Sequence, residues 1–175
     1  MNIVLIGMPG AGKSTVGVIL AKMMGRMFVD TDLMIQEKEK RLLQEILNQD
    51  GTGRFLKIEE EVLLALESVN SVIATGGSVV YSEPAMKRLK SCGVVVYLKL
   101  PYEEIQNRLS NITTRGVIMD RNQSLFGVYE ERIPLYEKYA DLVIDCKDRN
   151  VEEIVREIAD KTDRQDEGGW HGYLP

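Results

Sequence analysis

Residues 7–14 read Gly-Met-Pro-Gly-Ala-Gly-Lys-Ser and match the pattern GxxxxGK followed by Ser or Thr at every fixed position. An apolar run at residues 3–6 precedes them and residues 15–21 predict a helix after them, so the order is strand, loop, helix. In that order, the loop N–H groups and the helix N-terminus bind a phosphate chain. Lys13 would reach the β- and γ-phosphates of ATP, and the Ser14 hydroxyl would bind Mg²⁺. A glycine-rich turn alone requires neither residue. The residues that we expect against the nucleotide phosphates are Gly10, Ala11, Gly12, Lys13, Ser14 and Thr15.

Two carboxylates follow the next apolar strand, which is predicted at residues 27–29. Asp30 and Asp32 lie at the carboxyl end of that strand, where an α/β sheet binds its ligands. Asp32 is suited to accept a hydrogen bond from a substrate hydroxyl and to take its proton late in phosphoryl transfer. Asp30 is suited to hold Mg²⁺ through water. The alternative is that one of them only caps the following helix, a role that aspartate also performs well.

A second glycine turn, Gly76-Gly77-Ser78, follows the strand predicted at residues 71–75. Because they lack side chains, Gly76 and Gly77 would let backbone N–H groups approach a substrate closely. A simple strand-to-helix turn is the alternative.

Strands alternate with helices along the chain, which predicts an α/β fold with a parallel sheet and helices on both of its faces. Further strands are predicted at residues 94–98 and 142–144. Helices are predicted at residues 33–47, 54–68, 101–109, 124–139 and 151–158, with a turn at residues 50–53. Residues 110–123 show little periodicity and predict a mobile lid. We expect one domain over residues 1–162 and a loose tail over residues 163–175.

The composition limits the partners of the chain. Its 175 residues carry a net charge of −5, which argues against nucleic acid as the main partner. No apolar run is long enough to cross a bilayer and no basic segment precedes the first strand, so we expect a cytoplasmic protein without a membrane partner. Cys92 and Cys146 lack the spacing of a zinc site, and the only histidine is His171 near the end. We expect a monomer with a small-molecule substrate.

Together these residues resemble the shikimate kinases, a branch of the nucleoside-monophosphate-kinase-like P-loop proteins. The resemblance covers residues 1 to about 160 and rests on several separate motifs in order. They are the P-loop at residues 7–14, Asp30-Thr31-Asp32, Gly76-Gly77, Arg115 in the predicted lid, and residues 131–136. The resemblance implies a three-layer fold with a five-stranded parallel sheet, the use of ATP and Mg²⁺, and phosphoryl transfer to a ring hydroxyl of a small carboxylate. Shikimate, converted to shikimate 3-phosphate in aromatic amino acid biosynthesis, is the acceptor that it implies.

Four arginines take expected roles from this resemblance. Arg115 would swing over the phosphates, neutralise charge during the transfer and exclude water. Arg132 would grip the substrate carboxylate with its planar guanidinium, although acidic neighbours on the same helix also allow an ordinary salt bridge. Arg108 would stack near adenine, and Arg149 would lie in the loop beside the base.

The substrate half of the expected site departs from the family pattern. Leu56 stands where the family has a second arginine for the shikimate carboxylate. Loss of that charged group would cost about a hundredfold in binding if nothing replaces it. Arg54 is close in sequence, but residues two apart on a helix point in different directions. Ser78 stands for the third glycine of the turn, and Gly116 stands for the proline after the lid arginine.

We therefore predict an ATP-dependent small-molecule kinase with shikimate as the acceptor. Lys13 and Arg115 would stabilise the transferring phosphoryl group, and Ser14 and Asp30 would hold Mg²⁺. The residues that we expect at the acceptor are Asp32, Leu56, Gly76, Gly77 and Arg132. Two alternatives are a kinase for another hydroxylated metabolite and a nucleotide sensor that transfers no phosphate. A nucleoside monophosphate kinase is a third, but the Asp-x-Asp and Gly-Gly turns resemble the shikimate branch better.

Overall fold

The computed structural model describes residues 1–110 and 123–167, and for residues 164–167 only the course of the backbone. Most of the predicted lid, with Arg115 and Gly116, lies outside the described residues, as do residues 168–175. The role predicted for Arg115 therefore stays a prediction.

Five strands form one parallel sheet, as the alternation of elements predicted. They are β1 (Asn2–Ile6), β2 (Met27–Asp30), β3 (Ser71–Ala74), β4 (Gly93–Lys99) and β5 (Leu142–Asp145), in the spatial order β2-β3-β1-β4-β5. β1 is central, and its Leu5 pairs with Ala74 on one side and with Val96 on the other. β1, β3 and most of β4 are buried, which explains their unbroken apolar runs. The carboxyl ends of β1, β2 and β3 meet at one end of the sheet, where an α/β fold binds its ligands.

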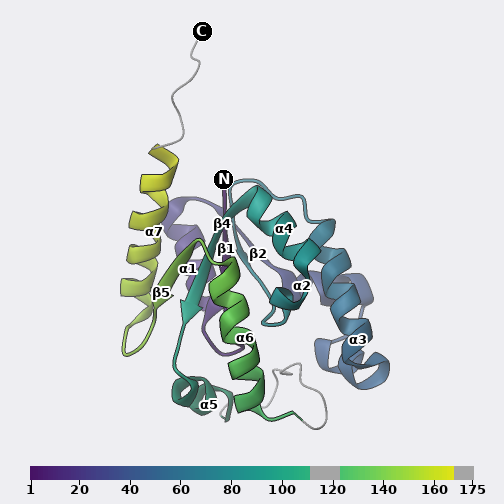
Figure 1. The fold of residues 1–175 in the computed structure, drawn as a ribbon. Helices are drawn as coiled ribbons and strands as arrows, with labels where there is room; N and C mark the ends of the chain where they lie inside the picture. The colour runs from purple at the N-terminus through teal and green to yellow at the C-terminus, as the bar shows by residue number, and fades with distance from the viewer. Residues whose placement is uncertain (111–122, 168–175) are drawn as a thin grey trace.

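Helices cover both faces of this sheet (Figure 1). On one face, α1 (Lys13–Met24) packs against α7 (Val151–Glu167), and on the other face α4 (Glu83–Cys92) and α6 (Leu125–Tyr139) contact β4. α2 (Thr31–Glu39) packs on α3 (Leu43–Leu64), which contacts α4. α5 (Tyr102–Ser110) and the short 3-10 helix η1 (Val79–Tyr81) complete the described helices. The result is the three-layer fold that the family resemblance implied.

The helix predicted at residues 33–47 is wrong, because the structure has two helices there. α2 ends where Lys40 adopts a left-handed conformation with φ 54°. α3 begins after Leu42, whose backbone N–H donates a hydrogen bond to Oε2 of Glu45 at 2.8 Å. This local cap interrupts a pattern that looks continuous by periodicity alone. The turn predicted at residues 50–53 is a single break inside α3 at Gly51, with φ 77° and ψ 169°.

α7 runs further than its sequence pattern indicated, and α6 continues across a proline. α7 continues past residue 158 to Glu167, and the buried Thr162 hydroxyl donates to the carbonyl oxygen of Ile158 at 2.9 Å within it. α6 extends to Tyr139, as predicted, and continues through Pro134, a residue type that usually kinks or interrupts a helix. In the part of the chain that the structure describes, the helices lack the length and apolar composition needed to span a membrane.

Candidate active site

The P-loop of residues 7–14 joins β1 to α1 in the order that its motif predicted. Gly10 and Gly12 have left-handed φ angles of 82° and 92°, which glycine adopts without strain. The buried Lys13 ammonium donates hydrogen bonds to the carbonyl oxygens of Gly7 at 2.8 Å and Met8 at 2.9 Å. No side chain among the described residues caps α1 at Gly12, so the positive end of this helix is available to an anion.

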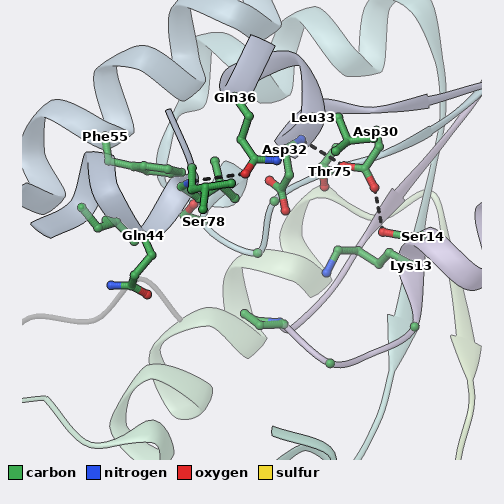
Figure 2. Close-up of a pocket in the computed structure, with 18 of the residues that line it drawn as sticks. Lys13, Ser14, Asp30, Asp32, Leu33, Gln36, Gln44, Phe55, Thr75 and Ser78 are labelled. Atoms are coloured by element: carbon green, nitrogen blue, oxygen red, sulfur yellow. Dashed lines mark hydrogen bonds between the residues drawn. The ribbon is translucent and has the colours of Figure 1, made fainter. Parts of the chain in front are cut away.

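Asp30 connects the P-loop to the start of α2. Its Oδ2 accepts a hydrogen bond from Ser14 Oγ at 2.8 Å, and its Oδ1 accepts one from the backbone N–H of Asp32 at 3.0 Å (Figure 2). Asp30 therefore caps α2, as one reading of the sequence allowed, and also contacts the P-loop. A hydroxyl and a carboxylate this close supply oxygen ligands of the kind that Mg²⁺ binds. These two side chains therefore fit a magnesium ion beside the phosphates.

A cavity of about 580 Å³ opens beside the P-loop. Figure 2 shows Asp32 and Lys13 pointing into the same space from α2 and α1. The predicted site residues that line it are Gly10, Gly12, Lys13, Ser14, Asp30, Asp32, Gly76, Gly77 and Arg132. Its apolar wall, which the sequence analysis did not predict, consists of Leu33, Leu42, Leu43, Leu47 and Phe55 from α2 and α3 and the segment between them. The cavity thus brings the phosphate-binding loop together with polar and apolar residues that could contact an acceptor.

Tyr136 on α6 holds the Gly-Gly turn in place. Its hydroxyl donates a hydrogen bond to the carbonyl oxygen of Gly77 at 2.6 Å, and its ring stacks on Tyr97 with 5.1 Å between centroids. A Cβ atom at position 77 would lie 2.6 Å from Cδ of Pro9 in the P-loop. The turn therefore needs glycine here, because it presses against the phosphate-binding loop.

Gly76 is equally confined, from the side of α2 and α3. Its N–H donates to the Thr31 hydroxyl at 3.3 Å. A Cβ atom at this position would lie 2.3 Å from Oε1 of Glu59 and 3.0 Å from Oδ1 of Asp32. This glycine thus lets two carboxyl groups approach the same point of the backbone.

Arg132 also lines the cavity, with only 1% of its surface exposed. Its Nε donates a hydrogen bond to the Tyr81 hydroxyl at 3.1 Å, and its guanidinium carbon is 5.1 Å from the centroid of the Tyr81 ring. Its helical neighbours Glu130 and Glu131 are exposed. A buried, oriented guanidinium is suited to bind a carboxylate with two parallel hydrogen bonds.

Glu59 on α3 is 2% exposed, and it was not among the residues predicted for the site. Its Oε2 accepts a hydrogen bond from Ser78 Oγ at 2.7 Å. Burial raises the pKa of the Glu59 carboxyl to about 7, and the charge of Asp32 acts in the same direction. Helical spacing contained the signal, because Glu59 follows Phe55 by four positions and precedes Val62 by three. It is therefore a glutamate on an apolar stripe.

Leu56 lines a separate cavity of about 130 Å³, together with Glu59 and Ser78. Arg54 points elsewhere: its side chain is 48% exposed and its Nη1 lies 3.4 Å from Oε1 of Glu61. Position 54 belongs to a helical stretch of α3, so the unwinding that would redirect Arg54 is not seen. Arg54 therefore does not replace the arginine that the family pattern has at position 56.

Arg108 and Arg149 were both expected beside the nucleotide base. Arg108 on α5 donates from Nη1 to the carbonyl oxygen of Gly10 at 3.4 Å and pairs with Glu104. Arg149 follows β5, donates to the carbonyl oxygen of Asp145 at 3.0 Å and pairs with Glu157 on α7. Arg108 is thus next to the P-loop, whereas the contacts of Arg149 fasten its loop to α7. Their roles toward a base stay predictions.

This sheet order, with the P-loop leading out of the central strand into an acceptor cavity, defines an ATP-dependent P-loop kinase of small molecules. The family model for shikimate kinase matches residues 9–163. The chain is 39% identical to a shikimate kinase of Thermodesulfovibrio yellowstonii, over 95% of this chain and 98% of that protein. A shikimate kinase of Mycobacterium avium is 38% identical, over 90% and 91%. The chain belongs to the shikimate kinase family.

Solved structures agree with this assignment. Shikimate kinase from Acinetobacter baumannii in complex with shikimate matches with a TM-score of 0.84 and 31% identity, over 94% of this chain and 93% of that chain. Shikimate kinase from Aquifex aeolicus matches with a TM-score of 0.79 and 32% identity, over 97% of this chain and 100% of that chain. The likeness therefore extends over nearly the whole chain.

Proposed function

We propose that this chain transfers the γ-phosphate of ATP to a hydroxyl of shikimate, giving shikimate 3-phosphate in aromatic amino acid biosynthesis. One observation carries the proposal: Lys13, Asp32 and Arg132 line the same cavity. They supply an ammonium for the phosphates, a carboxylate for the acceptor hydroxyl and a guanidinium for the acceptor's acid group. The relative from Acinetobacter baumannii, solved in complex with shikimate, supports this choice of acceptor.

On the phosphate side, Lys13 exchanges its hydrogen bonds with the carbonyl oxygens of Gly7 and Met8 for contacts with the β- and γ-phosphates. The uncapped N-terminus of α1 adds N–H donors and a partial positive charge. Mg²⁺ held next to Ser14 and Asp30 would neutralise phosphate charge during the transfer. Arg115, from the predicted lid, would cover the phosphates and exclude water.

On the acceptor side, Asp32 accepts a hydrogen bond from the reacting hydroxyl and takes its proton as the new bond to phosphorus forms. Gly76 and Gly77 bring the backbone close to the acceptor, and Tyr136 fixes their position. Arg132 binds the acceptor carboxylate and so sets the distance of the hydroxyl from the phosphate. Catalysis then rests mainly on orientation and charge stabilisation.

A second candidate is phosphorylation of another hydroxylated metabolite. The observation that favours it is the position of Arg54, which points to Glu61 and leaves Arg132 as the single arginine among the described lining residues. The apolar wall of the cavity also offers contact to an acceptor with less charge than shikimate. The acidic balance of the chain supports a small metabolite over nucleic acid in either case. We propose that the enzyme acts in the cytoplasm.

Release of ADP by the purified protein with ATP and Mg²⁺, with and without shikimate, tests the proposal. We expect turnover that depends on shikimate and is lost in Lys13→Ala and Asp32→Asn. Turnover with another hydroxylated metabolite, and none with shikimate, would replace the first candidate with the second. Binding of ATP without turnover on any acceptor of such a panel would favour a nucleotide sensor.

A further inference from the structure

Glu59 is a buried carboxyl group that the proposed reaction does not use. Ser78 Oγ donates to its Oε2 at 2.7 Å. The other oxygen, Oε1, is buried without a hydrogen-bond partner among the described residues. Burying an ionised carboxylate is costly when one of its oxygens has no hydrogen-bond partner. The protonated carboxyl is neutral, so burial favours it.

Three charged groups from other elements face this carboxyl. Asp32 at the start of α2 opposes its ionisation, while Arg132 on α6 and Lys13 on α1 favour it. Burial outweighs the hydrogen bond from Ser78 and the two cations, and raises the pKa of the Glu59 carboxyl to about 7. Gly76 is the point of contact, because a Cβ atom there would meet both Glu59 and Asp32. Protonation of Glu59 therefore changes the charge directly beside the Gly76-Gly77 turn.

The leucine at position 56 cannot form a salt bridge with the Glu59 carboxyl. Leu56 precedes it by three positions on α3, and the cavity of about 130 Å³ lies beside both residues. Side chains three apart on a helix are neighbours, so an arginine at position 56 would reach the Glu59 carboxyl. Leucine offers no charge, and the hydroxyl of Ser78 takes the position of partner instead.

We propose that Glu59 is a specificity-determining residue, which must hold a proton for an acidic acceptor to bind well at Arg132. This inference rests on the proposed function, since it concerns the same acceptor site. When Glu59 is ionised, its negative charge repels the acceptor carboxylate. It also offsets part of the positive charge with which Arg132 attracts that carboxylate. Binding of an acidic acceptor and binding of the proton therefore favour each other, as linkage requires. Position 56 and Glu59 together set how strongly the site prefers an acid.

The affinity for shikimate should then fall as Glu59 ionises. If only the protonated form binds, the KM for shikimate rises about thirtyfold from about pH 6 to about pH 8.5, because each unit above the pKa removes tenfold of that form. Glu59→Gln mimics the protonated carboxyl, so its KM should stay low and nearly constant across this range. A residue that only stabilises the fold would not give tighter binding at high pH when replaced.

The experiment measures kcat and the KM for shikimate against pH, at saturating ATP and Mg²⁺, for the wild type and three variants. Glu59→Gln and Leu56→Arg should both flatten the rise in KM, the second because an arginine compensates the charge of Glu59. Glu61→Gln is the matched control, since Glu61 is exposed and its pKa is lowered by Lys38, and it should keep the wild-type profile. Parallel profiles for the wild type and Glu59→Gln would overturn the proposal.

A titration of labelled glutamate carboxyl groups by carbon NMR, in the protein without substrate, separates this inference from the proposed function. A glutamate that titrates near pH 7, and shifts downward in Leu56→Arg, supports the inference even if Glu59→Gln does not fold. Titration of every glutamate at ordinary acidic pH contradicts it. Absence of shikimate turnover at every pH contradicts the proposed function instead. The NMR titration then still decides whether Glu59 is protonated near pH 7.

Discussion

Ser14 on α1 and Asp30 at the end of β2 are joined by a hydrogen bond of 2.8 Å from hydroxyl to carboxylate. The same carboxylate caps α2 by accepting from the N–H of Asp32 at 3.0 Å. One aspartate therefore sets the position of the helix that carries the proposed acceptor base relative to the phosphate-binding loop. If Asp30 holds Mg²⁺ and Asp32 orients the acceptor as proposed, metal binding and acceptor orientation are coupled through this aspartate.

Asp30→Asn should separate the two roles of this residue. Asparagine caps a helix about as well as aspartate, so the free energy of unfolding should change by less than about 1 kcal/mol. The lost charge should raise the Mg²⁺ concentration needed for half-maximal rate by about tenfold. Rates measured against free Mg²⁺ at fixed ATP, with a urea unfolding curve, check both parts. An unchanged Mg²⁺ requirement would remove Asp30 from the metal site.

Arg132→Lys should weaken acceptor binding much more than ATP binding. Lysine keeps the charge but cannot form two parallel hydrogen bonds with a carboxylate, and Arg132→Met loses the charge as well. We expect the KM for shikimate to rise about tenfold in the first variant and about a hundredfold or more in the second. The KM for ATP should stay within about twofold of the wild type, since the proposed partner of Arg132 is the acceptor carboxylate. Equal increases for both substrates would argue against a specific carboxylate contact.

Tyr136→Phe removes the hydroxyl that holds Gly77 and keeps the ring that stacks on Tyr97. The carbonyl oxygen of Gly77 loses its 2.6 Å partner, so the protein should lose about 1 to 2 kcal/mol of stability. The turn should also loosen and raise the KM for shikimate. Tyr129→Phe is the control, because it removes a similar bond to the Leu100 carbonyl, at 3.1 Å, from a residue outside the described cavity lining. If both variants affect the KM equally, the turn has no special dependence on Tyr136.

The stability of the protein should report the proton on Glu59. Its folded pKa of about 7 lies above the ordinary value of 4.5, so the folded state binds this proton more tightly than the unfolded state. Its stabilising contribution is complete below about pH 4.5 and is lost as pH rises through about 7. Relative to Glu59→Gln, the wild type should therefore lose on the order of 3 kcal/mol across that window. Chemical unfolding of both proteins at several pH values measures the difference, and a constant difference would contradict the assigned pKa.

The phosphate half of the site was predictable because its chemistry is local in sequence. The P-loop motif fixes a strand, a loop and a helix over a few residues, and Asp30 and Asp32 follow the end of a short strand. Parallel strands end on the same side of the sheet, so these segments had to meet. The structure confirms the sheet and places Lys13, Ser14 and Asp32 around one cavity.

The acceptor half depends on contacts between distant segments, which periodicity does not contain. Glu59 meets Ser78 only because α3 packs beside η1, and Tyr136 reaches Gly77 across 59 positions of sequence. The end of α2 at Lys40 could not be predicted from the sequence either, because a left-handed conformation is uncommon for residues other than glycine. The Arg54 side chain points toward Glu61 at the surface, and helical geometry alone did not predict this direction.

Transfer of the phosphoryl group can be followed directly, by mixing enzyme, Mg²⁺ and γ-labelled ATP with shikimate and identifying the labelled product. We expect label in a shikimate phosphate at a rate that saturates with shikimate, and loss of this product in Asp32→Asn while ATP still binds. Label that appears only as inorganic phosphate, or product formation that is undiminished in Asp32→Asn, would contradict this expectation.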